Sequence, residues 1–319
     1  MNRYTQPEIY QGFNQTQQYF EGWYFKLVSQ DLKTSLALIP GISLAKKDPH
    51  SFIQAFVVKH GAQPTLKNVY LRFPKEEFVA QKSRFSVGIG MNQFSLSHLH
   101  LDLKQDDFSL KGDIQLQDIT PLNRGFMNPS IMGPFAYLPK MECYHGVISL
   151  LHTLKGKLVI QGETVDFTGG KGYLEKDWGT SFPSAYVWMQ GNHFPEPNTA
   201  FFFSYANIPY LGLRFQGLIS HLYLQGKHYR FATYNGGKVA SEILGDQQVE
   251  YVLKRGDYRL RIVGSIDQVV NLPSPKFGKM DHAIKEGLSG EILLWLMKGK
   301  TILYQGKSTL AGIEIMKKR

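Results

Sequence analysis

Short strand-like runs that end at turn residues recur along nearly the whole chain, and this pattern constrains the fold most. YFEGWYFKLVS, HSFIQAFVVKH and NQFSLSHLHLDLK are examples, each bounded by Gly, Pro, Asn or Asp. Helix signals are confined to PKEEFVAQK and FGKMDHAIKEGLSG. LKGKLVIQG and EILLWLMKGKTILYQGKS are typical of hairpins, the latter around Lys298-Gly299-Lys300. The sequence therefore predicts an all-β fold of antiparallel meanders that form barrels or sandwiches, with few short helices.

The length of 319 residues suits about two domains. TPLNRGFMNPSIMGPFAYLP, residues 120–139, is rich in Pro, Gly and Asn and is typical of a long connector. We place the boundary shortly after it, which gives an N-terminal β-barrel half over residues 1–150 and a C-terminal half over 151–319.

The formal charge of +10 and the pI of about 9.4 favour anionic partners. Lys and Arg are scattered and form no recognition-helix or RNP-like pattern, so we expect no nucleic-acid binding, while a peripheral contact with an anionic membrane surface stays open. The single Cys143 excludes an intramolecular disulfide. The polar N-terminal sequence has no apolar stretch typical of a signal peptide, so we expect a cytoplasmic protein.

One segment, GYLEKDWGTSFPSAYVWMQGNHF, holds an unusual density of acids, amides and aromatic groups. Read as a strand, its end places Tyr186, Trp188, Gln190, Asn192 and Phe194 on one face. A core face would be aliphatic, because a buried amide without a partner costs about 1 to 3 kcal/mol. A face that mixes aromatic rings with amides is typical of a ligand pocket.

Acids stand beside aromatic residues at strand spacing in three places. Glu21 shares a face with Trp23, and Glu142 shares one with Tyr144. Glu175 and Asp177 point to one side of their strand while Lys176 points to the other. A carboxyl group in apolar surroundings has a raised pKa and can act as a general acid. The alternative is a structural role, in which a buried acid bonds to a backbone amide or an arginine, or Glu-Lys-Asp forms a solvated rim.

Other signals are weak. His98 and His100 share a strand face but have no third ligand at a suitable spacing, so we predict no metal site. Gly88-Ile-Gly90 lacks a third glycine and a following helix, and Cys143 has little support beyond nearby His145. The two classes of function that remain consistent with the sequence are an enzyme that needs no cofactor and a binding protein.

The segments FEGWYFK, MGPFAYLPKMECYHGVISL, GGKGYLEKDWGTSFPSAYVWMQGNHF, FATYNG and AGIEI resemble the tocopherol cyclase family, in particular its bacterial tocopherol cyclase-like members. The resemblance covers nearly the whole chain in order. It implies two lipocalin-like β-barrel halves and a relation to proteins that hydrate or cyclise isoprenoids.

In that family the plant enzymes close a prenylated quinol into a chromanol without a cofactor or a redox change. The resemblance implies that an acid protonates an alkene, and that a phenol oxygen captures the resulting cation. Aromatic faces can stabilise such a cation by about 2 kcal/mol or more each when desolvated. A non-catalytic carrier of an apolar or amphiphilic molecule is the alternative. The candidate acids are Asp177, Glu175, Glu142 and Glu21, and the candidate substrate-binding residues are Trp23, Tyr24, Tyr144, His145, Trp178, Tyr186, Trp188, Gln190, Asn192, His193 and Asn235.

Overall fold

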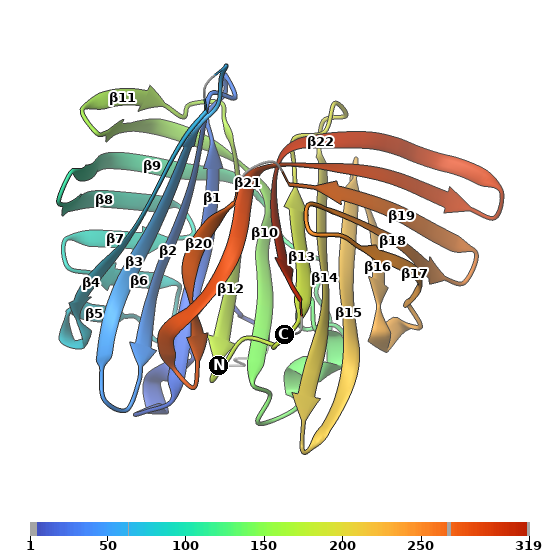
Figure 1. The fold of residues 1–319 in the computed structure, drawn as a ribbon, viewed down its shortest axis with the longest axis horizontal. Coiled ribbons are helices and arrows are strands. Elements are labelled where there is room, and N and C mark those ends of the chain that lie inside the picture. Colours follow the sequence, from blue (N-terminus) through green and yellow to red (C-terminus); the bar gives the residue numbers. More distant parts are fainter. Residues whose placement is uncertain (1–4, 63, 267–268, 318–319) are drawn as a thin grey trace. The chain divides into compact units, whose positions relative to one another are not determined.

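The computed structural model describes residues 5–62, 64–266 and 269–317, and nearly all of their regular structure is β-strand (Figure 1). Helical structure among these residues consists of the short 3-10 turns η1 (Gly12–Asn14), η2 (Lys75–Glu77), η3 (Gly133–Tyr137) and η4 (Thr233–Asn235). Within this part of the chain, no helix has the length and apolar character needed to cross a membrane. The predicted all-β class is confirmed.

The chain forms two compact units, which are described separately. Unit 1 comprises the described chain up to Ser130, Glu142–Phe182 and Pro273–His282, and unit 2 comprises Ile131–Met141, Pro183–Leu272 and the chain from Ala283 onward. Residue 150, where the sequence places the boundary, lies inside strand β10 (Cys143–Ile160) of unit 1. The main division falls after Phe182 instead, because β12 (Lys171–Gly179) pairs with both β1 and β10 and so belongs to the first sheet.

Unit 1 is built on an antiparallel sheet of twelve strands in the order β4-β3-β2-β1-β12-β10-β9-β8-β7-β6-β5, with β11 beside β10 (Figure 1). The strands that complete it are β1 (Tyr19–Val28), β2 (Thr34–Leu44), β3 (Pro49–Lys59), β4 (Thr65–Pro74), β5 (Phe78–Ala80), β6 (Ser86–Ile89), β7 (Asn92–Ser95), β8 (His98–Gln105), β9 (Phe108–Thr120) and β11 (Glu163–Asp166). Strands β3 and β6 also contact each other, so the sheet curves into a nearly closed barrel.

Alternation along the strands fills the core of unit 1. In β1, Trp23, Phe25 and Leu27 point into the hydrophobic core, as their spacing predicts. Leu174 of β12 joins the same core and Trp178 packs against it. Since alternate residues point to opposite faces, the residues between them lie on the other face of the sheet.

The second antiparallel sheet has ten strands in the order β16-β15-β14-β13-β22-β21-β19-β18-β17, with β20 beside β21 (Figure 1). It belongs to unit 2 except for the part of β20 and β21 within Pro273–His282. Its strands are β13 (Tyr186–Gly191), β14 (Thr199–Tyr210), β15 (Leu213–Leu224), β16 (Lys227–Ala232), β17 (Lys238–Leu244), β18 (Gln248–Arg255), β19 (Tyr258–Ser265), β20 (Val270–Lys276), β21 (Lys279–Lys298) and β22 (Thr301–Met316). Val187, Met189, Phe201 and Phe203 belong to its hydrophobic core.

Both helix predictions are wrong. PKEEFVAQK forms only the turn η2 followed by β5, and most of FGKMDHAIKEGLSG lies in β21. In β21, Ile284 and Glu286 are buried while Ala283 and Lys285 are exposed, which is the two-residue period of a strand. The C-terminal hairpin is confirmed, since Lys298 pairs with Thr301. In LKGKLVIQG, β10 continues to Ile160 and the turn comes at Gln161-Gly162.

Candidate functional site

Strand β12 carries different side chains on its two faces. Leu174, Lys176 and Trp178 point to the interior of unit 1, whereas Tyr173, Glu175 and Asp177 lie on the opposite face. The two acids therefore share a face and Lys176 points away, as the alternation predicts. Because β12 is flanked by β1 and β10, the face with the acids also receives side chains from those strands.

His145 of β10 connects the two acids. It lies directly opposite Asp177 in the sheet and diagonal to Glu175. Its Nδ1 is 2.7 Å from Oδ1 of Asp177, and its Nε2 is 3.3 Å from Oε2 of Glu175. The exposed fractions of the side chains are 14% for His145, 5% for Glu175 and 23% for Asp177, so the acid nearest to solvent is Asp177. We call these three residues the His145 cluster.

Two further side chains of the same face contact the cluster. The Tyr173 hydroxyl donates a hydrogen bond of 2.5 Å to Oε2 of Glu175, and Cys143 Sγ lies 3.7 Å from Oδ1 of Asp177. Burial, together with Glu175, raises the pKa of Tyr173 well above its ordinary value. Burial and Asp177 likewise raise the pKa of the Cys143 thiol. Both groups therefore stay protonated at neutral pH and act as hydrogen-bond donors toward the carboxylates.

The His145 imidazole is protonated at neutral pH. Burial lowers its pKa, but the carboxylates of Asp177 and Glu175 outweigh this effect and raise the pKa to about 10. The cluster thus combines a charged ring with two acidic side chains. It can exchange protons among three groups and can stabilise a positive charge that develops beside it.

This raised pKa predicts a pH dependence of stability. The ordinary pKa of histidine is 6.5 and the value in the folded protein is about 10, so the stabilisation is complete below pH 6.5 and is lost as the pH rises through 10. We expect the free energy of unfolding in urea to fall over this range in the wild type. His145→Gln should show a weaker decrease, and nitrogen NMR of the His145 ring should show both nitrogens protonated at pH 8. A neutral ring at that pH would contradict the prediction.

The His145 cluster also has the composition of a metal site. One histidine nitrogen and two carboxylate oxygens lie within 4.8 Å of one another, which suits a divalent cation. The sequence analysis predicts no metal. In the structure, the His145 ring pairs with both acids.

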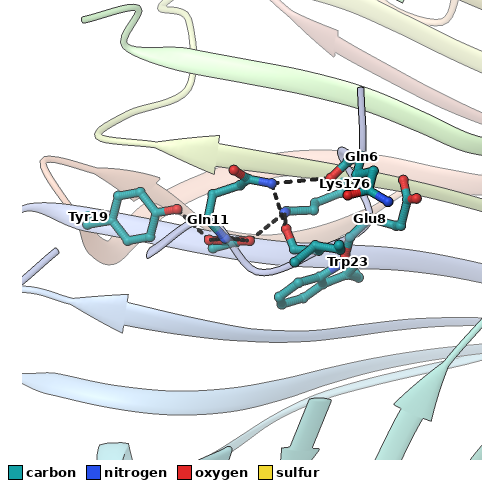
Figure 2. A network of polar contacts seen from close by, with 8 residues as sticks. Gln6, Glu8, Gln11, Tyr19, Trp23 and Lys176 are labelled. Carbon is teal, nitrogen blue, oxygen red and sulfur yellow. Dashed lines mark hydrogen bonds and ion pairs between the residues drawn. The ribbon is translucent and has the colours of Figure 1, made fainter. Parts of the chain in front are cut away.

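A second polar network, which includes Gln11, Tyr19 and Lys176, lies on the inner face of the same strands (Figure 2). Within it, Glu21 and Lys176 form an ion pair. Both side chains are fully buried. Glu21 also accepts hydrogen bonds from the Tyr19 hydroxyl and from the Gln11 backbone N–H, and Lys176 Nζ donates to the backbone oxygen of Ile9 over 2.6 Å. Burial raises the pKa of Glu21 and lowers that of Lys176. The surrounding hydrogen bonds correspond to the structural role that the sequence analysis left open for this acid.

The tryptophans of unit 1 surround this ion pair. Lys176 Nζ lies 4.9 Å from the ring centroid of Trp23 and 4.6 Å from that of Trp178. Tyr144 stacks on Trp178 at 5.5 Å. These three aromatic candidates are thus on the face of the sheet opposite the His145 cluster, and the tryptophan rings already contact a cation.

The aromatic candidate on the His145 side is Tyr24. It is opposite Glu175 in the sheet and packs against Tyr173 with ring centroids 6.4 Å apart. Gly22, opposite Asp177, has no side chain that could cover that carboxyl. Glu142 is half-buried just before β10, and its backbone oxygen accepts a hydrogen bond from Thr180.

The predicted wall of aromatic and amide groups belongs to unit 2. Val187 and Met189 point into the core of that unit, so Tyr186, Trp188 and Gln190 lie on the opposite face of the sheet, and all three are buried. The Tyr186 hydroxyl donates a hydrogen bond of 2.7 Å to Glu314 of β22.

The other candidates of unit 2 lie outside this wall. Asn192 and His193 follow the end of β13, with Asn192 buried and His193 half-buried. Asn235 stabilises η4, because its Oδ1 accepts from the backbone N–H of Ala232 and its Nδ2 donates to the backbone oxygen of Arg230. These bonds hold the tight turn in shape.

Sequence analysis missed a pair of histidines in unit 2, on the face of the sheet that also carries Trp188 and Gln190. His221 Nε2 and His228 Nδ1 are 2.9 Å apart, and Arg230 is directly opposite His221. Burial lowers the pKa of both histidines, which keeps them neutral. The signal was the spacing of two histidines around the turn LQGK, which brings them close across a hairpin.

The fold has relatives among solved structures. CghA with Sch210972 aligns with a TM-score of 0.62 and 9% identity over 94% of this chain and 89% of that chain. A protein assigned as AttH from Nitrosomonas europaea aligns with a TM-score of 0.54 and 14% identity, over 95% of this chain and 94% of that chain. Kievitone hydratase from Nectria haematococca aligns with a TM-score of 0.51 and 11% identity, over 96% of this chain and 93% of that chain. These similarities confirm the predicted lipocalin-like architecture.

Sequence comparison is informative at the level of the family. No curated protein sequence matches the chain significantly. A family model described as tocopherol cyclase-like matches residues 118–316, which is more than half of the chain and includes both the His145 cluster and β13. The chain therefore belongs to the tocopherol cyclase-like family.

Proposed function

We propose that this protein is a cyclase- or hydratase-like enzyme that acts on a prenylated quinol or another isoprenoid without a cofactor, with the His145 cluster as its acid–base site. The observation that carries the proposal is the His145 ring held between the two carboxylates of β12. Membership of the tocopherol cyclase-like family supports it. The fold shared with a protein named kievitone hydratase supports the same class of reaction.

Asp177 is the proposed proton donor, because its side chain is the most exposed of the three and faces Gly22. Asp177 takes up the proton of the neighbouring His145 imidazolium and passes it to the alkene, so that a tertiary carbocation forms on the adjacent carbon. The phenol oxygen of the substrate attacks this cation, a C–O bond closes the ring, and the phenol proton returns to the cluster. No electron is gained or lost, and a water molecule in place of the phenol oxygen gives the hydrated product.

The remaining groups of the site hold the acids in position and stabilise the carbocation. Glu175 is nearly buried, raises the pKa of His145 and places a second carboxyl group near the developing carbocation. Tyr173 holds Glu175 in place through its hydroxyl. The ring of Tyr24, which packs against Tyr173, offers an aromatic face to the developing charge.

Native mass spectrometry with organic extraction of the protein from its host is the first test. We expect a co-purified isoprenoid or quinol, and incubation with prenylated hydroquinones should give a ring-closed isomer of unchanged mass or a product heavier by one water. A ligand that stays tightly bound and never reacts would overturn the enzyme proposal in favour of the carrier alternative.

A further inference from the structure

The hairpin of β14 and β15 extends beyond both neighbouring strands of unit 2 (Figure 1). Pairing of β14 with β13 ends at Ala206, and pairing of β15 with β16 begins at Ile219. Between Ile208 and Gly217, therefore, the two strands pair only with each other among the described strands. A two-stranded ribbon is only marginally stable by itself, so its side chains need a further surface against which to pack.

This projecting ribbon has one apolar face. The cross-strand pairs Ile208–Phe215 and Tyr210–Leu213 alternate with Pro209–Arg214, so the first four side chains share a face. Leu211 occupies the turn. Polar hairpin tips normally carry Asn, Asp and Gly, whereas this tip reads IPYLGLRF.

The apolar residues at the end of the ribbon are exposed. Leu211 is 73% exposed and Leu213 is 76% exposed. Nearer to the sheet, Phe215 packs against Phe135 of η3 with ring centroids 5.8 Å apart, so only the tip is uncovered. Tyr210 and Arg214 flank the two leucines, and these residue types prefer the interface between a lipid bilayer and water.

The apolar face of the ribbon continues toward the predicted wall. Ile208 and Tyr210 follow Ser204 and Ala206 on one face of β14, and these two residues are opposite Trp188 and Tyr186 of β13. An apolar molecule that leaves a bilayer at the tip would thus reach the buried aromatic residues of β13 along one continuous face of the sheet.

We propose that the tip of the β14–β15 hairpin docks onto lipid bilayers that contain anionic lipids, by inserting Leu211 and Leu213 below the headgroups. The net charge of +10 supplies the long-range attraction to such a surface, and the two leucines supply the apolar contact. This proposal concerns binding and does not depend on the chemistry proposed for the His145 cluster.

Co-sedimentation of the full-length protein with phosphatidylcholine vesicles, with and without phosphatidylglycerol, tests the proposal. We expect binding to the anionic vesicles that weakens as salt is added, and a loss of more than about tenfold in affinity in the double variant Leu211→Asp/Leu213→Asp. Val79→Asp/Met91→Asp is the matched control: Val79 is 64% exposed and Met91 is 74% exposed in unit 1, so this variant adds the same two charges and should bind like the wild type. Equal binding by wild type and the double variant, or no binding by either, would overturn the proposal.

A second measurement reports insertion directly. In Leu213→Trp, the fluorescence of the new tryptophan should shift to shorter wavelength with anionic vesicles and should be quenched by brominated acyl chains, whereas Met91→Trp should show neither change. An unshifted Leu213→Trp spectrum would refute insertion. If the wild type instead self-associates without lipid and the double variant is monomeric, the tip is a contact between copies of the chain and the bilayer proposal is wrong.

Discussion

Replacing Asp177 by asparagine is expected to lower kcat for a prenylated hydroquinone by about 10² to 10⁴, the usual contribution of a general acid. The amide has the same shape but cannot donate a carboxyl proton. The change also removes the closer of the two carboxylates that raise the pKa of His145, so the ring is less strongly protonated. Steady-state kinetics across pH, with a urea unfolding curve to verify the fold, measure the effect.

Asp118→Asn is the control for this experiment. Asp118 is exposed at the end of β9, and its positive φ of 55° suits asparagine as well as aspartate. We expect its kcat to equal that of the wild type. If Asp177→Asn retained full activity while folding normally, Asp177 could not be the proton donor and the proposed mechanism would fail.

Replacing Lys176 by methionine is expected to destabilise the protein by about 3 to 5 kcal/mol, the usual effect of removing one partner of a buried ion pair. Methionine fills a similar volume between the rings of Trp23 and Trp178, so the loss reflects charge rather than space. Without the ammonium group, Glu21 is left fully buried with only hydrogen bonds to neutral donors. Urea unfolding measures the change.

The loss in Lys176→Met should depend on pH in a defined direction. Burial raises the pKa of Glu21 above its ordinary 4.5, and the variant lacks the ammonium group that opposes this rise. The folded state therefore keeps a proton that the unfolded state releases, and stability decreases as the pH rises above 4.5. The double variant Glu21→Gln/Lys176→Met should recover much of the loss at neutral pH. No recovery would show that the lysine acts through packing.

The most accurate predictions from the sequence came from the alternation of side chains along single strands. Alternation placed Glu175 and Asp177 on one face of β12 with Lys176 on the other, because neighbouring side chains of a strand always point oppositely. The same rule separated Trp188 and Gln190 from the core residues Val187 and Met189. The helix prediction for FGKMDHAIKEGLSG failed, since β21 is held between β19 and β22 and pairing outweighs a weak helical propensity.

The sequence by itself determined the all-β class, the resemblance to the family and the set of polar residues from which any site must be built. Only the tertiary structure decided which acids belong together. Glu21 and Asp177 are on adjacent strands, yet Glu21 is tied to Lys176 inside unit 1 whereas Asp177 meets His145 on the other face. Strand order and register set these contacts. The Glu21–Lys176 contact requires pairing of β1 with β12, segments more than a hundred residues apart, and the His145–Asp177 contact joins β10 and β12 over 32 positions, so no local pattern encodes either one.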